Sequence, residues 1–143
     1  MSIQSILDRK GSEVITIQAS ETVRSAADLM RYHRVAALVM KSGDAFTGLM
    51  SERDIVHAIS RHGERALSMA VQEVVPRAMV TVEPTDTLKR AMSLMTHHRV
   101  RHLLVTSEDK FVGIVSIGDV VKYRLEDLET ESNVLRDAYI SAR

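Results

Sequence analysis

GIVSIGDVVKY, residues 113–123, and GLMSERDIVHA, residues 48–58, share one pattern: Gly, two apolar residues, Ser, two variable residues, Asp and two apolar residues. The polar positions of this pattern are Ser51, Asp54, Ser116 and Asp119. A shift of 65 positions superimposes the two stretches, and it aligns residues 16–56 with 81–121 without a gap, with 16 of the 41 positions identical. Because the period covers most of the chain, the sequence is an internal repeat of two copies.

Both copies predict the same order of secondary structure. Short β-branched runs indicate strands at 14–17 and 79–82, and apolar residues at helical spacing follow, with Ser20 and Thr85 as the predicted N-caps. Paired apolar runs indicate hairpins, and second helices begin at Ser51 and Ser116. We therefore expect an α/β fold of two β-α-β-β-α units packed about a pseudo-twofold axis, at residues 1–66 and 67–124, with a C-terminal helix at 125–143.

The composition restricts the classes of function. The 19 basic and 19 acidic residues of this 143-residue chain cancel, which argues against a nucleic-acid partner. No apolar run approaches the roughly 20 residues that span a bilayer, and the N-terminal residues lack the apolar core of a signal peptide. We therefore expect no membrane partner and a cytoplasmic location. Cysteine is absent, and no phosphate-binding glycine loop or nucleophilic set is found, so we expect no catalytic residues.

The doubled pattern resembles a known family. The stretches TVEPTDTLKRAMSLM (81–95) and HRVRHLLV (98–105), followed by Gly-apolar-apolar-Ser-x-x-Asp, resemble the CBS motif, named after cystathionine β-synthase. Two such motifs in tandem resemble a Bateman module, and the second half is similar to stand-alone two-CBS proteins, including a plant mitochondrial type linked to thioredoxin regulation. The resemblance implies a regulatory module that binds AMP, ADP, ATP or NAD(H). The alternative is a structural or redox-partner scaffold without nucleotide dependence.

Asp54 and Asp119 have two interpretations. Ser followed three residues later by an acidic residue is a capping box at a helix start, which is a purely structural role. The functional interpretation is that each aspartate accepts hydrogen bonds from the two hydroxyls of a ribose, because an ionised carboxylate offers two acceptor oxygens. The resemblance implies this ribose role, with Ser51 or Ser116 nearby.

Differences between the copies also point to a ligand site. Arg101 and His102 align with Ala36 and Ala37, so the shared fold does not require their charges. The resemblance implies that this pair of positions lines the ligand cleft and meets phosphate, whereas the alternative is two solvated surface charges.

Arg53 and Gly118 differ in the same way, and each directly precedes its aspartate. By resemblance, Arg53 serves the ligand held by Asp119, and the pair Arg101–His102 serves the ligand held by Asp54. Gly118 leaves room for a longer phosphate group. The adenine walls implied by the resemblance, or alternatively simple core residues, are Ile15, Val35, Val80 and Val100.

Two further segments invite functional interpretations. The run HHRVRH at 97–102 contains three histidines, but the expected change from helix to strand breaks the spacing that a metal needs, so no metal site is predicted. The tail from residue 125 has an apolar stripe that includes Leu125, Leu128, Leu135 and Tyr139. This stripe either folds back on its own module or joins two subunits, and we expect a homodimer, with a regulated protein as a further partner.

Overall fold

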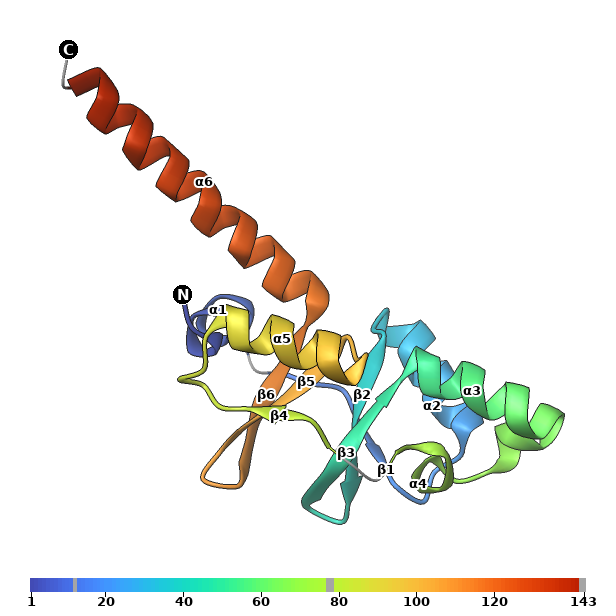
Figure 1. The fold of residues 1–143 in the computed structure, drawn as a ribbon. Coiled ribbons are helices and arrows are strands. Elements are labelled where there is room, and N and C mark those ends of the chain that lie inside the picture. Colours follow the sequence, from blue (N-terminus) through green and yellow to red (C-terminus); the bar gives the residue numbers. More distant parts are fainter. Residues whose placement is uncertain (12, 77–78, 142–143) are drawn as a thin grey trace. The chain divides into compact units, whose positions relative to one another are not determined.

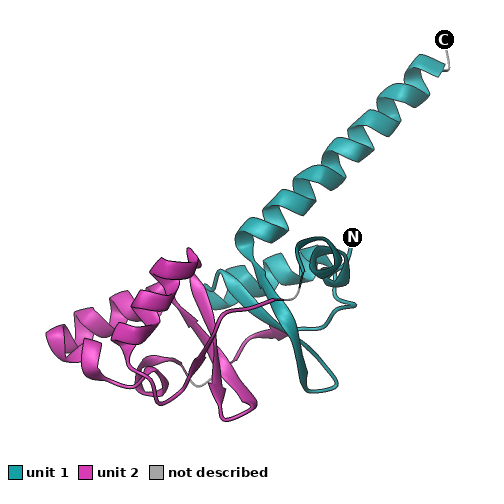
Figure 2. Cartoon of the chain, turned by 180° about the vertical axis from the view of Figure 1, so that it is seen from behind, with its two compact units in different colours: residues 1–12, 82–143 teal, residues 13–81 magenta. Residues whose placement is uncertain are grey.

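The chain forms two compact units, one of residues 13–81 and the other of residues 1–12 together with 82–143 (Figure 2). The computed structural model describes residues 1–11, 13–76 and 79–141. The predicted α/β fold with two β-α-β-β-α copies is confirmed. The expected boundary at residue 66 follows the sequence repeat, whereas the compact units follow packing. Among the described residues, no helix is long and apolar enough to cross a membrane.

The unit of residues 13–81 is built on a three-stranded mixed sheet (Figure 1). β1 (Thr16–Gln18) is parallel to β2 (Ala37–Ser42), and β2 is antiparallel to β3 (Ala45–Ser51). The remaining elements are helices, namely α2 (Val23–His33) between β1 and β2, α3 (Glu52–His62) directly after β3, the 3-10 helix η1 (Gly63–Ser68) and the short α4 (Val71–Val74).

The second sheet has the same order of strands. β4 (Thr81–Val82) neighbours β5 (His102–Ser107), which is antiparallel to β6 (Lys110–Ser116). α5 (Leu88–His98) connects β4 with β5, and α6 (Ile117–Ser141) follows β6 directly and projects from its unit as one long helix (Figure 1).

The N-terminal helix α1 (Ile3–Lys10) belongs to the unit of the second copy. The Ile3 backbone N–H donates to the Asp86 carbonyl at 2.9 Å, and that of Gln4 donates to the Pro84 carbonyl at 2.9 Å. Ile3 and Ile6 are fully buried. The hydrophobic core of this unit therefore depends on a segment that precedes β1, the first strand of the other unit.

The predicted N-caps of the first helices are wrong by two residues. Thr22 Oγ1 accepts a hydrogen bond from the Ser25 N–H at 3.1 Å, and Thr87 Oγ1 accepts one from the Arg90 N–H at 3.1 Å. The reason is long-range pairing, because isolated β-bridges join Thr22 to Ala70 and Thr87 to Ser2. These bridges keep the backbone extended up to each threonine, so α2 and α5 start later than local propensity predicts.

The helices α2 and α5 end at the same tripeptide, His33-Arg34-Val35 in one copy and His98-Arg99-Val100 in the other. Arg34 and Arg99 both adopt the left-handed conformation, with φ of 55°. The N–H of Val35 then donates to the Met30 carbonyl at 3.0 Å, and Val100 does the same to Met95 at 3.0 Å. This six-to-one bond is the Schellman termination, which turns the chain from each helix into the next strand.

Equivalent positions in the two copies supply the cores. The helices α2 and α5 each bury their first, fourth and eighth residues, whereas Met92 in α5 is 42% exposed. The central strands β2 and β5 are also buried in their middle. The equivalent core residues are Val23, Ala26, Met30, Leu38 and Val39 in one unit and Leu88, Ala91, Met95, Leu103 and Leu104 in the other.

We predict that Ile6→Ala lowers the free energy of unfolding by about 2–5 kcal/mol, because it leaves a cavity in a packed core. Amide hydrogen exchange should accelerate in β5 and β6 and remain slow in β2 and β3. The matched control is Ile140→Ala, since Ile140 is 58% exposed on α6, and this change should alter stability by less than about 0.5 kcal/mol. Faster exchange in β2 and β3 alone would contradict the assignment of α1.

Candidate functional site

The first Ser-x-x-Asp stretch lies where β3 passes into α3. Ser51 is the N-cap of α3, with an extended backbone. The Ser51 N–H donates to Asp54 Oδ2 at 2.8 Å, and the Ser51 hydroxyl donates to the same oxygen at 3.2 Å. The carboxylate of Asp54 is half-buried. One of its two oxygens is therefore occupied by the helix start.

The second Ser-x-x-Asp stretch repeats this arrangement where β6 passes into α6. The Ser116 N–H donates to Asp119 Oδ2 at 2.9 Å, and Ser116 Oγ accepts from the Asp119 N–H at 3.1 Å. Both stretches thus perform the capping role that the sequence predicted. Among the described residues, none donates a hydrogen bond to Oδ1 of Asp54 or of Asp119, so each carboxylate keeps one acceptor oxygen for another group.

Backbone hydrogen bonds place the two neighbouring positions that differ in charge between the copies, 36–37 and 101–102, beside the start of the following helix. The Glu52 N–H donates to the Ala36 carbonyl at 3.0 Å, and the Ile117 N–H donates to the Arg101 carbonyl at 2.8 Å. In the sheet register, Ala37 pairs with Ser51 and His102 pairs with Ser116. The structure therefore brings Arg101, His102, Ser116 and Asp119 together within one unit, as it does the corresponding residues of the first copy.

The other predicted site residues lie at the ends of the same strands. The Ile15 carbonyl accepts from the Val39 N–H at 2.9 Å, which places Ile15 beside β2. Val35 and Val100 follow the helix ends, and both are half-buried, as are Ile15 and Val80. Arg53 is exposed in the first turn of α3, directly before Asp54.

Lys10 is a functional candidate that the sequence did not reveal. Its Nζ donates to Asp119 Oδ2 at 2.6 Å and to the Ile114 carbonyl at 3.0 Å. Half-burial of the Asp119 carboxyl raises its pKa, but the hydrogen bonds from Lys10 and Ser116 and the charge of Lys10 together lower the pKa below its usual 3.8. Asp119 is therefore ionised at neutral pH and has a cation beside it.

Family models match the chain at two places. The model described as the CBS domain fits residues 6–61 and 71–126, which are the two copies of the repeat. The chain belongs to the CBS-domain family. CBS-pair proteins often form oligomers and commonly bind adenosyl ligands, and those that consist of CBS domains alone are generally regulatory.

Individual relatives agree with this assignment. The mitochondrial CBS domain-containing protein CBSX3 of Arabidopsis thaliana is 33% identical, over 97% of this chain and 71% of the relative. The crystal structure of a CBS-domain containing protein from Agrobacterium tumefaciens superimposes with a TM-score of 0.83 at 33% identity, covering 86% of this chain and 92% of that chain. The predicted resemblance to stand-alone two-CBS proteins, the plant type included, is thus confirmed.

One solved relative holds metal. The crystal structure of Hypoxic Response Protein I contains two coordinated zinc ions, and it superimposes with a TM-score of 0.71 at 26% identity over 86% of this chain and 98% of that chain. In the present CBS pair, no group of three or more His, Cys, Asp or Glu side chains among the described residues could hold a metal ion. His97 and His98 end α5, whereas His102 begins β5, so the run at 97–102 changes from helix to strand as predicted.

We predict that Lys10→Met lowers the free energy of unfolding at pH 7 by about 1 kcal/mol, the typical value of a charge-assisted pair with partial solvent access. Because the folded-state pKa of Asp119 is lowered, its stabilisation is present above the unfolded pKa and is lost as the pH falls through the folded value. The stability difference between variant and wild type should therefore begin to shrink near pH 3.8 and disappear as the pH falls further, through the lowered folded-state pKa. Urea unfolding at several pH values measures this difference.

The control is Lys89→Met, which removes the same charge from an exposed position of α5. It should leave stability nearly unchanged at every pH. A Lys10→Met deficit of constant size from pH 7 to pH 3 would show that the lysine acts through its methylene packing and not through its charge.

Proposed function

We propose that this CBS pair is a regulatory module that binds adenine nucleotides and reports their level to a partner protein. The observation that carries the proposal is the pair of helix starts in which a half-buried aspartate uses one oxygen for the cap. The second oxygen of each carboxylate accepts no hydrogen bond from the described residues. A carboxylate oxygen has two lone pairs, so Oδ1 can accept from one or both hydroxyls of a ribose.

The surroundings of each aspartate fit an anionic nucleotide. An N-terminal helix turn attracts negative charge through its backbone N–H groups. We propose that Arg53 and the pair Arg101–His102 bind phosphate, with Arg53 serving the Asp119 ligand and the pair serving the Asp54 ligand. The proposed adenine environment consists of Ile15, Val35, Ala36, Ala37, Val80 and Val100. The candidate ligands, all of which carry the ribose diol, are AMP, ADP, ATP and NAD(H).

The remaining parts of the proposal concern assembly and chemistry. We propose that the protein regulates another protein and does not itself catalyse a reaction, in line with the general role of stand-alone CBS proteins. We also propose a homodimer, and the absence of cysteine suits the reducing cytoplasm as its location.

A scaffold function is the second candidate. Its support is that Ser51 with Asp54, and Ser116 with Asp119, are satisfied as capping boxes without any ligand. Thermal shift with AMP, ATP, NADH and GTP separates the two functions. A ligand at 100 times its Kd adds about 2.7 kcal/mol of stability, whereas no stabilisation by any of the four nucleotides would favour the scaffold.

We predict that Asp54→Asn and Asp119→Asn each weaken the binding of AMP at one site by tenfold or more. The loss of a charge-assisted hydrogen bond costs about 1.5–3 kcal/mol, and asparagine can still cap the helix. Titration calorimetry measures the change. The matched control is Asp86→Asn, because Asp86 Oδ2 accepts from the Glu83 N–H at 2.8 Å in a similar local cap away from the proposed site.

The ribose contact has its own control. Wild-type protein should bind 2′-deoxy-AMP more weakly than AMP, since the deoxy compound cannot donate one of the two proposed hydrogen bonds. Equal calorimetric affinities for the two nucleotides would remove the ribose role of both aspartates.

We predict that the two arginines act at different sites. With Asp119→Asn as the background, Arg101→Ala should weaken the remaining nucleotide site about tenfold, and Arg53→Ala should have little effect. With Asp54→Asn as the background, Arg53→Ala should weaken the remaining site about tenfold, and Arg101→Ala should have little effect. Calorimetry at two salt concentrations should also show weaker binding at the higher one, as expected for phosphate contacts. A reversed pattern in the two backgrounds would show that the assignment of arginines to sites is inverted.

A further inference from the structure

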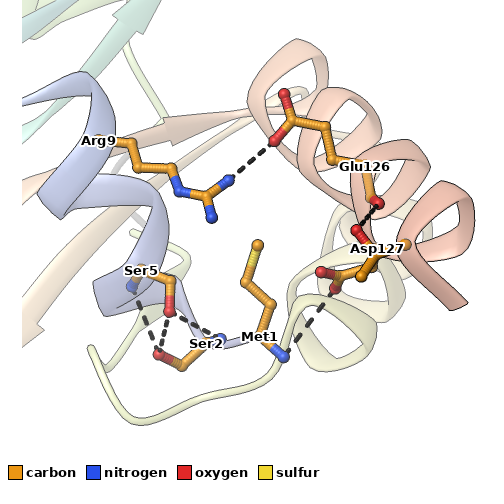
Figure 3. Close-up of polar contacts among 7 residues, drawn as sticks. Met1, Ser2, Ser5, Arg9, Glu126 and Asp127 are labelled. Carbon is orange, nitrogen blue, oxygen red and sulfur yellow. Dashed lines mark hydrogen bonds and ion pairs between the residues drawn. The ribbon is translucent and has the colours of Figure 1, made fainter. Parts of the chain in front are cut away.

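α6 extends beyond the rest of the unit to which it belongs (Figure 1). Its first turns contact α1 through Lys10 and Asp119. Two further ion pairs hold the same part of α6, Arg9 with Glu126 at 2.8 Å and the Met1 amino group with Asp127 at 4.0 Å (Figure 3). Every residue from 128 to 141 is exposed. An isolated helix of fewer than about 15 residues is marginal in water, so residues 128–141 of α6 need tertiary or quaternary packing to be stable.

The exposed part carries an apolar stripe with heptad spacing. The α6 stripe, as we call it, repeats at alternating intervals of four and three residues, which keeps its members on one side of a supercoiled helix. Its apolar members are 44–72% exposed, and Ser132 occupies the one polar position between them. The members are Val121, Leu125, Leu128, Ser132, Leu135 and Tyr139.

The α6 stripe faces away from the packing surface of its own unit. The buried residues of α6 are Val120 and Tyr123, which lie on a different side of the helix from Val121 and Leu125. Arg9 lies over the ring of Tyr123 at 5.3 Å, which confirms that this side contacts α1. One helix therefore presents one face to its own unit and keeps a second apolar face for another partner.

The charges beside the stripe identify that partner as a second copy of the same helix. Arg124 and Glu131 flank the stripe on one side, and Glu129 and Arg136 flank it on the other. In a parallel, in-register pair, a flanking residue faces the residue five positions later on the opposite helix. Arg124 then meets the partner's Glu129, and Glu131 meets the partner's Arg136, so both pairs have opposite charges and each occurs twice.

The antiparallel arrangement that pairs all six members of the stripe lacks this complementarity. If Leu125 packs on the partner's Leu135, residues of the same flank meet each other. Glu129 then faces the partner's Glu129, and Lys122 faces the partner's Arg136. Like charges at these positions disfavour pairing.

We propose that the α6 stripe forms a parallel, in-register coiled coil with the α6 of a second copy of the chain. This inference deepens the proposed homodimer, because it names the helix, the orientation and the register, and it does not depend on nucleotide binding. The experiments below therefore use the full chain without nucleotide.

Sedimentation equilibrium tests the surface. Leu128→Glu with Leu135→Glu should raise the dimer Kd by at least tenfold. The matched control is Val134→Glu with Ile140→Glu, which adds the same charge at exposed apolar positions outside the stripe and should change the Kd less than twofold. A wild-type chain that is monomeric at micromolar concentration overturns both the homodimer and the coiled coil. A dimer with the same Kd in all three proteins overturns the coiled coil alone.

Cysteine cross-linking tests the orientation, and the natural chain contains no cysteine to interfere. Ser132→Cys should form a disulfide-linked dimer rapidly under mild oxidation with copper phenanthroline, because the parallel register places the two copies of this position face to face. Asn133→Cys, one position outside the stripe, should cross-link at least tenfold more slowly. Equal rates for both variants, or rapid cross-linking only between Ser132→Cys and Leu128→Cys chains when mixed, would overturn the parallel pairing.

Charge reversal tests the register. Glu129→Arg should weaken the dimer several-fold, because it sets two arginines against each other at both symmetric pairs. Adding Arg124→Glu in the same chain restores opposite charges and should return the Kd to within about twofold of wild type. If the second change fails to rescue the first, Arg124 and Glu129 do not face each other.

Discussion

The start of the second helix in each copy is the constraint on which the rest of the unit depends. The first helical N–H, of Glu52 or Ile117, donates to the carbonyl of the residue directly before β2 or β5. This bond fastens the helix to the inner strand of the hairpin, and the serine and aspartate caps complete the junction. Because the hydrogen bond to the strand and the capping bonds both fix the helix start, the aspartate carboxylate has a defined position even without a ligand.

The capping bonds also explain why sequence alone could not separate structure from function. A capping box uses the same two residue types, at the same spacing, as the ribose-binding pattern proposed for Asp54 and Asp119. The two roles proved compatible in geometry, since the cap uses Oδ2 and leaves Oδ1 without a donor among the described residues. A pattern of letters cannot distinguish the two oxygens of one carboxylate, so the choice between the roles depends on ligand binding.

Features encoded locally were predictable, and features set by distant pairing were not. The repeat and the order of elements follow from spacing within each copy. The N-caps were misplaced because bridges to Ala70 and Ser2 delay the helices. Lys10 was missed because it lies 109 residues from Asp119 in the chain. The segment before β1 also matches its counterpart at an offset of 68 instead of 65, so the repeat gave no aligned partner for Lys10.

The position of α1 also dictates an order of folding during synthesis. Its binding surface consists of residues that include Pro84, Asp86 and Ile114, so α1 emerges from the ribosome long before its packing partners exist. At translation rates of about 5–20 residues per second, the delay between Lys10 and Asp119 is roughly 5–20 s. Residues 13–81, which form their own compact unit, are all synthesised within that interval. α1 is therefore made well before it can dock, and its apolar residues Ile3 and Ile6 stay exposed on the nascent chain until then.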